Sequence, residues 1–200
     1  MQKMAPRALR PGPFNAAPNG LPRAHGLYDP ANEHDACGVG FIADLKGNKS
    51  HTIIEQGLEI LVNLTHRGAA GADPRDGDGA GMLVQIPHEF FEEVCAPLGF
   101  TLAEPGEYAV GQIFMPSNQA QRIYCESAIE RVIESEGLTL LGWRTVPKDN
   151  ATLSPEVIET EPVHRQIFIG RGSGITNESE FERRLLVLRK VISNTINGET

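Results

Sequence analysis

The chain has 200 residues, of which 40% are hydrophobic, and its formal net charge at pH 7 is −8. This length and composition can support one ordinary globular domain with a core, or part of a larger one, and they argue against a purely disordered chain. The excess of acidic residues argues against a nucleic-acid-binding protein, because such proteins need clustered Lys and Arg to contact phosphates.

Residues 1–36 form a leader whose composition differs from that of the rest of the chain. They hold six of the 14 prolines, and no acidic residue appears before Asp29. An organelle transit peptide is also poor in acidic residues, but this leader lacks serine and its prolines prevent a long amphipathic helix. We therefore predict an extension over residues 1–36 and a folded domain over residues 37–200.

Beyond the leader, segments with strand and helix spacing follow one another. CGVGFIADL at 37–45 has the pattern of a strand, and Ser50 is placed to cap a helix that runs to about Thr65. A Gly- and Asp-rich loop spans residues 66–81. The later predicted elements are a strand at 82–86, a helix at 88–99, a strand at 108–115, a helix from a Ser117 cap to about Glu136, strands at 138–146 and 165–170, and a helix at 179–196 with Phe181, Leu185, Leu188 and Ile192 on one face. This order predicts a mixed α/β domain with a largely antiparallel sheet.

The three cysteines, Cys37, Cys95 and Cys125, are odd in number and show no CxxC spacing. Neither a disulfide framework nor a metal site is therefore predicted, and a reducing cytoplasm is the expected location. No apolar run approaches the roughly 18–20 residues that cross a bilayer, and no signal-peptide segment precedes Cys37. We expect a soluble, cytoplasmic protein with no membrane or nucleic-acid partner.

Three segments resemble ligand-binding motifs, and each departs from its motif. GRGSGI at 170–175 lacks the third glycine of a dinucleotide-binding loop, so it is interpreted as a turn. DPRDGDGAG at 73–81 has the wrong Asp spacing for a calcium loop and no glutamate at the twelfth position. HEFFE at 88–92 lacks the second histidine of a zinc-protease helix, so it is interpreted as a surface helix.

Cys37 stands where the leader meets the first apolar segment. A free cysteine at a strand start is often only a small buried hydrophobic residue, and no histidine of this chain stands in a cysteine-protease signature. If the Ala36–Cys37 bond is cut, however, the new α-amino group, of pKa about 7.7–8.0, can accept the proton of the thiol, whose reference pKa is about 8.5. One residue then supplies both nucleophile and base, so Cys37 is the predicted catalytic residue.

Three stretches carry a family resemblance: NEHDACGVGFIADLKG, LTHRGAAGAD and GDGAGMLVQIP. Together they resemble the start of the large subunit of glutamate synthase, over residues 28–200 and most densely over 28–91. The resemblance implies a propeptide over 1–36 that is removed to expose Cys37, and a class II glutamine amidotransferase domain over 37–200. It implies the N-terminal nucleophile hydrolase fold, an α+β fold of four αββα layers with two antiparallel sheets, of which only the first part is present here.

The same resemblance implies the reaction and its participants. L-glutamine and water give glutamate and ammonia, and the ammonia passes to a flavin domain where 2-oxoglutarate becomes a second glutamate. The complete enzyme would hold FMN and an iron–sulfur cluster and use NADPH, NADH or ferredoxin; no cofactor is expected in this fragment. The implied partners are the remaining domains of the large subunit and a small NAD(P)H-oxidising subunit.

The resemblance also suggests residues of the glutamine pocket. Arg67 and Gly68 are expected to line it near Cys37, with Asp78 as a secondary contact, whereas the alternative is that this loop only forms turns. His66 is expected to make a structural hydrogen bond. In the family, the oxyanion donors lie in an HNGEIN motif and further substrate contacts in an RFSTN motif; both belong downstream of residue 200, so these residues alone are not expected to be active.

Two alternatives remain open from the sequence. Another class II amidotransferase would deliver ammonia to a different acceptor. An inactive regulatory or interaction module would share the fold but keep the leader, because the amine of Cys37 would then stay in a peptide bond.

Overall fold

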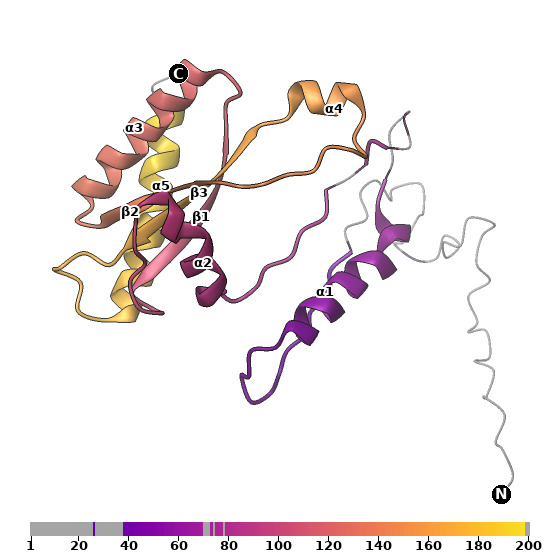
Figure 1. The fold of residues 1–200 in the computed structure, drawn as a ribbon, viewed down its shortest axis with the longest axis horizontal. Coiled ribbons are helices and arrows are strands. Elements are labelled where there is room, and N and C mark those ends of the chain that lie inside the picture. Colours follow the sequence, from indigo (N-terminus) through magenta and orange to yellow (C-terminus); the bar gives the residue numbers. More distant parts are fainter. Residues whose placement is uncertain (1–25, 27–37, 70–72, 74, 78, 199–200) are drawn as a thin grey trace, which may run out of the picture. The chain divides into compact units, whose positions relative to one another are not determined.

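The computed structural model describes residue 26 and residues 38–69, 73, 75–77 and 79–198. These residues fall into two compact units (Figure 1). The first unit contains the described residues up to Ala69 and those between Gly77 and Gly81; the second contains the others. Within the described residues, the sheet of the protein belongs to the second unit.

The first unit has two regular elements, helix α1 (His51–Asn63) and the short 3-10 helix η2 (Thr65–Arg67). Ser50 caps α1 as predicted, because its side chain accepts a hydrogen bond from the backbone N–H of Thr52 at 3.2 Å. No residue of α1 is fully buried, and Ile60 is among its half-buried residues. The helix therefore packs along one side only.

The second unit is built on a three-stranded antiparallel sheet of β1 (Tyr108–Met115), β2 (Thr139–Thr145) and β3 (Val163–Gly170). The strand order is β1-β3-β2, so β3 pairs with both neighbours. In the register, Tyr108 of β1 and Thr139 of β2 both lie opposite Gly170 of β3. The sequence predicted these strands and a largely antiparallel sheet, but not which strands pair, and the observed class is α+β.

Helices α3 (Gln119–Ser135) and α5 (Glu178–Gly198) pack together against one face of the sheet (Figure 1). They close a core in which the side chains of Ile129, Ile167 and Phe181 are almost fully buried. The predicted apolar face of α5 is confirmed, since all four of its residues belong to this core or pack against it: Phe181, Leu185, Leu188 and Ile192.

Helix α2 (His88–Cys95), followed by the 3-10 helix η3 (Ala96–Leu98), covers the other face. Side chains of successive strand residues point to opposite faces of the sheet. Ile167 therefore points toward α3 and α5, whereas Phe168 points to the other face and packs against α2. HEFFE forms a surface helix, as interpreted from the sequence: Glu89, Phe90 and Glu92 are exposed, and only Phe91 of this stretch is buried, at 6% exposed. The amphipathic spacing of this helix, rather than its acidic residues, decides its position.

The cap of one helix differs from the sequence prediction, and a second helix was not predicted. Asn118, not Ser117, caps α3, and its side-chain oxygen accepts a hydrogen bond from the backbone N–H of Gln121 at 3.1 Å. Both residue types can cap a helix, so the sequence alone did not separate them. Helix α4 (Pro155–Thr160), between β2 and β3, was not predicted because its six residues are too few to show a period.

The connection that carries α4 is tied at its base by Glu161. The carboxylate of Glu161 accepts hydrogen bonds from the ammonium of Lys148 and, at 2.7 Å, from the side-chain amide of Asn150. These two bonds hold the pKa of Glu161 below its usual range, because they stabilise the charged form. Glu161, which follows α4, is thereby bonded to Lys148 and Asn150, which precede the helix.

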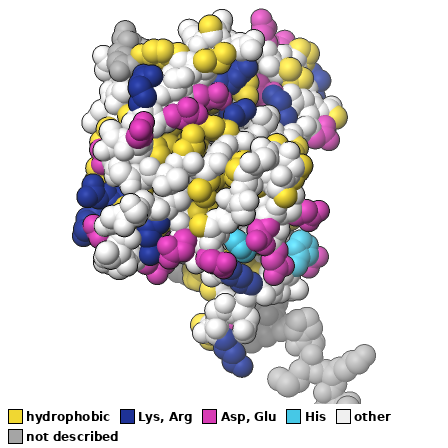
Figure 2. All heavy atoms as spheres, turned by 60° about the vertical axis from the view of Figure 1, so that its left-hand side comes forward, with side chains coloured by type: hydrophobic (Ala, Val, Ile, Leu, Met, Phe, Trp, Pro, Cys, Tyr) yellow, Lys and Arg dark blue, Asp and Glu magenta, His cyan; other side chains and the backbone are white. Residues whose placement is uncertain are grey.

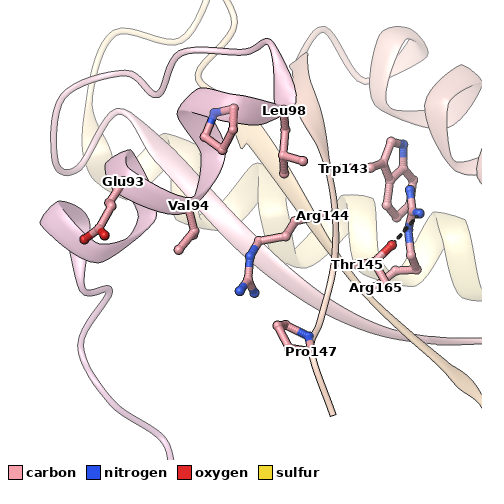
Figure 3. Close-up of a pocket in the computed structure, with 9 residues that line it drawn as sticks. Glu93, Val94, Leu98, Trp143, Arg144, Thr145, Pro147 and Arg165 are labelled. Carbon is pink, nitrogen blue, oxygen red and sulfur yellow. Dashed lines mark hydrogen bonds between the residues drawn. The ribbon is translucent and has the colours of Figure 1, made fainter.

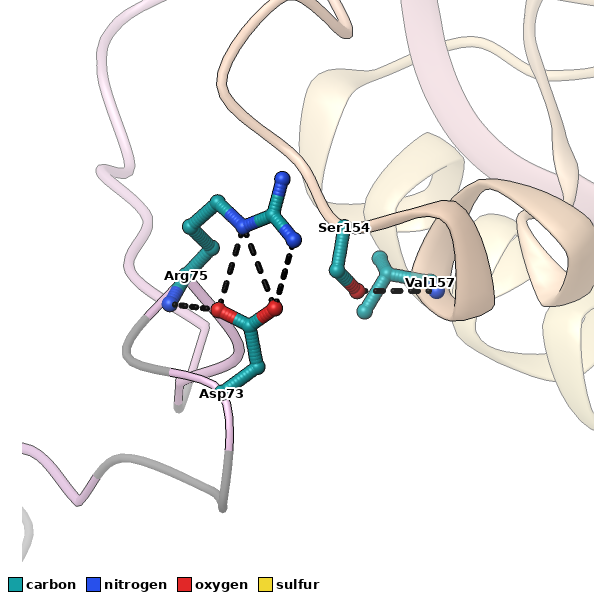
Figure 4. A network of polar contacts seen from close by, with 4 residues as sticks. All are labelled: Asp73, Arg75, Ser154 and Val157. Atoms are coloured by element: carbon teal, nitrogen blue, oxygen red, sulfur yellow. Dashed lines mark hydrogen bonds and ion pairs between the residues drawn. The ribbon is translucent and has the colours of Figure 1, made fainter.

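Ser154 is the buried cap of α4 (Figure 4). Its side chain is 0% exposed and accepts a hydrogen bond from the backbone N–H of Val157 at 3.3 Å. We expect Ser154→Ala to lower the free energy of unfolding by about 1 kcal/mol, the usual loss on removing a helix cap. Urea unfolding followed by circular dichroism measures this, with the exposed Ser173→Ala as the control variant. Equal stabilities of the two variants would contradict the capping role.

Two segments predicted as strands, at 37–45 and 82–86, form no strand in the described residues. Their apolar side chains stand exposed, Phe41 at 90% and Leu83 at 102%. A strand is held by hydrogen bonds to a neighbouring strand, and the described residues supply no partner beyond the sheet of the second unit. The prediction of a strand at these two segments was therefore wrong for the described residues, because an apolar pattern does not by itself supply a pairing partner.

GRGSGI forms a turn, as interpreted from the sequence. The backbone N–H of Ile175 donates to the carbonyl of Gly172 at 3.0 Å. A Cβ on Gly172 would lie 1.7 Å from the carbonyl oxygen of Gly137, so the glycine permits contact between two turns. The glycines therefore serve packing in this segment.

Charged side chains of both signs are interspersed over the face shown in Figure 2, with hydrophobic side chains visible between them. Within the described part of the chain, no helix has both the length and the apolar character needed to cross a membrane.

Candidate functional site

Two of the predicted site residues, Cys37 and Asp78, lie outside the described residues. The structure describes Gly38, which follows Cys37 in the chain. It also describes both ends of the 66–81 loop, which contains Asp78. The surroundings of the predicted nucleophile can therefore be built from the residue that follows it.

Gly38 lies against the end of α1 and the start of the loop. A Cβ on Gly38 would lie 2.9 Å from Cδ2 of Leu64 and 3.3 Å from Cβ of Arg67. The first distance is shorter than real Cβ contacts, so glycine allows this close approach. The Cβ of Arg67 thus lies next to the residue that follows Cys37, whereas the role of Arg67 in a glutamine pocket stays a prediction.

Side chains of η2 hold the loop start to α1. Nδ1 of His66 lies 2.9 Å from the backbone carbonyl of Asn63 and donates to it, since a carbonyl oxygen can only accept. The hydroxyl of Thr65 donates to the carbonyl of Val62 at 2.6 Å. The hydrogen bond of His66 agrees with the structural role predicted for it, and both bonds fix the backbone from which Arg67 extends.

Gly40 makes the second close approach to α1. A Cβ on Gly40 would lie 2.5 Å from Cγ2 of Ile60, a β-branched side chain that cannot easily rotate away. We expect Gly40→Ala to loosen the segment from α1 at a cost of about 1–3 kcal/mol, typical of overpacking, and to speed hydrogen exchange of the α1 amides. Gly81→Ala is the control, since nothing lies within 4 Å of a Cβ there. Unchanged exchange in Gly40→Ala would contradict the packing.

The conformation of Gly68 does not require glycine. Its φ of −83° and ψ of 154° are open to any residue, and a Cβ would meet the carbonyl oxygen of Thr65 at an ordinary 3.5 Å. Its backbone N–H donates to that same carbonyl at 3.2 Å and closes η2. The predicted contact of Gly68 with substrate remains a prediction.

A paired Asp and Arg shape the middle of the loop (Figure 4). Nη2 of Arg75 lies 2.6 Å from Oδ2 of Asp73, and the backbone N–H of Arg75 donates to Oδ1 of Asp73 at 2.9 Å. The hydrogen bonds from Arg75 lower the pKa of Asp73 to about 2. The backbone N–H of Asp76 donates to the carbonyl of Asp73 at 2.9 Å. This part of the loop is therefore a turn, as the sequence alternative expected.

The two described cysteines are free thiols at separate places. Cys95 is buried in the core under α2, where burial raises the pKa of its thiol, whereas Cys125 packs against the core on the opposite face of the sheet. An iron–sulfur cluster needs several thiolates gathered at one place. These two cysteines do not fit such a cluster.

The sequence comparison identifies the class of protein. Residues 37–200 match the family of class-II glutamine amidotransferases, and the chain belongs to this family. The match starts at Cys37, which is the predicted nucleophile.

Among individual proteins, the chain is similar to glutamate synthases that use different reductants. It is 45% identical over 176 residues to the glutamate synthase [NADPH] large chain of Bacillus subtilis, and 42% identical over 184 residues to the glutamate synthase [NADH] of Schizosaccharomyces pombe. It is 35% identical over 164 residues to ferredoxin-dependent glutamate synthase 2 of Synechocystis. These alignments cover 82–90% of this chain and 9–11% of each relative, so the chain spans about a tenth of their length.

Proposed function

We propose that this chain is the glutaminase part of a glutamate synthase, with the domain starting at Cys37 after removal of residues 1–36. The observation that carries the proposal is that the family match begins at Cys37, in a chain whose similar proteins are glutamate synthases with three different reductants. An amidotransferase with another ammonia acceptor is less well supported, since none of the similar proteins described above is one.

The mechanism uses both functional groups of an N-terminal cysteine. The α-amine takes the proton of the Cys37 thiol, and the thiolate attacks the side-chain amide carbon of glutamine. The amine returns the proton to the leaving nitrogen, so ammonia departs and a thioester remains. Water, deprotonated by the same amine, then releases glutamate. Each donor to the tetrahedral oxyanion would contribute about 2.7–4 kcal/mol.

The position of Arg67 supports a role in holding glutamine. Its Cβ lies beside Gly38, and its guanidinium is the kind of group that binds a carboxylate through two parallel hydrogen bonds. In the proposal, Arg67 holds the α-carboxylate of glutamine, while Gly68 and Asp78 line the pocket.

The exposed apolar segments support the four-layer fold of this family. In the proposal, residues 37–45 and 82–86 belong to a second antiparallel sheet completed by other parts of the enzyme. Val39 is 89% exposed and Leu83 102% exposed, and burying each would contribute about 1.5–3 kcal/mol. The second sheet would supply the hydrogen-bond partners these segments need.

The complete enzyme in this proposal carries FMN and an iron–sulfur cluster outside residues 37–200. A reductant would deliver electrons there, since the similar proteins are glutamate synthases named for NADPH, NADH or ferredoxin. A small NAD(P)H-oxidising subunit is a further proposed partner. The cytoplasm is the proposed location, in keeping with the free thiols of Cys95 and Cys125.

The intact mass and N-terminal residue of the native, full-length polypeptide test the proposal. We expect a chain that begins at Cys37, because only then is the amine available as a base. A mature chain that still carries residues 1–36 would overturn the mechanism and favour an inactive module of the same fold.

A further inference from the structure

The connection between β2 and β3 extends beyond the sheet of the second unit and carries α4 (Figure 1). We call this connection, residues 146–162, the α4 arm. Its two branches are joined where they leave the sheet, because the backbone N–H of Val146 donates to the carbonyl of His164 at 3.0 Å. The guanidinium of Arg165 on β3 also donates to the hydroxyl of Thr145 on β2 at 3.0 Å (Figure 3). The α4 arm therefore starts from a fixed base.

A second link joins the two branches within the α4 arm. The carboxylate of Glu161, which follows α4, accepts hydrogen bonds from Lys148 and Asn150, which precede it. The side chain of Glu161 is only 12% exposed, so these bonds are largely shielded from water. Removing this carboxylate would free the branches from each other at this point and loosen the end of the arm.

The far end of the α4 arm is covered. Ser154 is 0% exposed, and Leu153 and Val157 beside it are half-buried, whereas Thr152 and Pro155 are exposed. Burial of one side of a short arm is explained by a second segment packed against that side.

The second segment is the middle of the Gly- and Asp-rich loop, which we call the 73–76 turn and of which the structure describes Asp73, Arg75 and Asp76. This turn belongs to the same compact unit as α4, whereas the described residues on either side of it in the loop belong to the first unit. In Figure 4 the guanidinium of Arg75 points toward Ser154, and Figure 1 also draws the turn beside the start of α4. Oδ1 of Asp76 is buried as well. The 73–76 turn therefore packs against the α4 arm.

The 73–76 turn is stiff enough to transmit this contact to the loop. Nε of Arg75 lies 3.1 Å and its Nη2 2.6 Å from carboxylate oxygens of Asp73, so the side chain of Arg75 is held to the backbone of its own turn. The backbone N–H of Asp76 donates to the carbonyl of Asp73 and closes the turn. A contact at the guanidinium of Arg75 thus fixes the whole turn.

We propose that the α4 arm positions the loop of the glutamine pocket by holding the 73–76 turn in place. This inference rests on the proposed function, because Arg67 and Asp78, which contact glutamine in that proposal, stand in the chain on either side of this turn. Glu161 is then a positioning residue: it touches no substrate and acts through the α4 arm.

Hydrogen exchange of the complete enzyme tests whether the arm holds the turn, and it does so without any measurement of activity. Glu161→Ala removes the link within the arm and leaves Ser154 and Arg75 unchanged. We expect the amides of residues 75–77 to exchange at least about threefold faster in this variant, because the turn loses its support. Glu159→Ala, the same change at an exposed position of α4, should leave their exchange unaltered. If Glu161→Ala does not fold, Asn150→Ala removes one of the two bonds instead. Unchanged exchange in the folded variant would overturn the proposal.

Kinetics of the complete enzyme test whether the position of the turn matters for glutamine. Glu161→Ala should raise the KM for glutamine by at least about fivefold and leave the kcat with ammonia unchanged, since a displaced loop holds glutamine poorly. Glu161→Gln should stay near the wild type, because its amide oxygen can still accept both hydrogen bonds.

The Cys37→Ala variant separates failure of this inference from failure of the proposed function. If Cys37→Ala abolishes glutamine-dependent activity but Glu161→Ala leaves the KM for glutamine unchanged, the positioning role is wrong and the proposed function stands. If Cys37→Ala keeps glutamine-dependent activity, the proposed function is wrong, and the positioning role that rests on it is overturned too.

Discussion

Replacing Cys37 by alanine in the complete enzyme is expected to abolish glutamine-dependent glutamate formation while leaving ammonia-dependent formation intact. The thiol is the atom that attacks glutamine, and no other group in the proposed mechanism can form the thioester. Ammonia supplied in solution bypasses this step, because it is the product of the first site. Loss of a covalent nucleophile typically costs several orders of magnitude in rate, on the order of 10⁴–10⁶.

Assays of both activities on one preparation separate this expectation from general damage. Cys125→Ala is the matched control, a half-buried thiol on α3 whose removal should leave both activities near the wild-type level. Equal loss of the two activities in Cys37→Ala would count against separate sites for glutamine hydrolysis and glutamate synthesis.

Phe168→Ala is expected to lower the free energy of unfolding of the second unit by about 3–5 kcal/mol, the usual cost of removing a buried phenylalanine ring. Phe168 is 0% exposed on the central strand. Its ring meets that of Phe91 edge-on at 5.1 Å and that of Phe100 at 5.4 Å. The substitution leaves a cavity between the sheet and α2, and it removes both aromatic contacts.

Phe114→Ala provides the control for that measurement. Phe114 is 66% exposed, although its ring contacts that of His164 edge-on at 5.1 Å. Urea unfolding monitored by circular dichroism should show a loss near or below about 1 kcal/mol for Phe114→Ala. Similar losses in the two variants would show that the α2 side of the sheet contributes little to the stability of the unit.

The sequence predicted best those elements whose periodicity is long and whose ends carry recognisable residues. The β1 segment was placed at its observed bounds, and α5 at nearly its observed length, because alternation and helical spacing persist through them. Gly99 ends the η3 turn with a φ of +84°, as its composition indicated. These features depend on neighbouring residues, which a single sequence displays.

The sequence could not predict pairing or packing partners. The segment after Cys37 has the pattern of a strand, but a strand needs hydrogen-bond partners from other segments, and the pattern does not identify them. Likewise, the sequence placed His88 in a surface helix but did not show that its Nδ1 lies 3.1 Å from the hydroxyl of Tyr108. That contact depends on how α2 docks on the sheet.

The candidate site divides in the same way. The role of Cys37 was predicted from chemistry, because an N-terminal cysteine supplies its own base, and it stays a prediction. The approach of Gly38 to Arg67 required the structure, since it depends on how the chain turns back along α1.

The strand order β1-β3-β2 also bears on the order of folding events. Every pairing in this sheet joins segments within residues 108–170, and the helix that closes its core follows directly. The pairing of β1 with β3 joins residues as distant in the chain as Tyr108 and Gly170, so loop-closure entropy must be paid before this sheet forms. The segment after Cys37 is made earlier on the ribosome but has no sheet partner within the described residues. The strand pairings of the described sheet do not involve the segment after Cys37, so removal of the leader, as proposed, would leave these pairings unchanged.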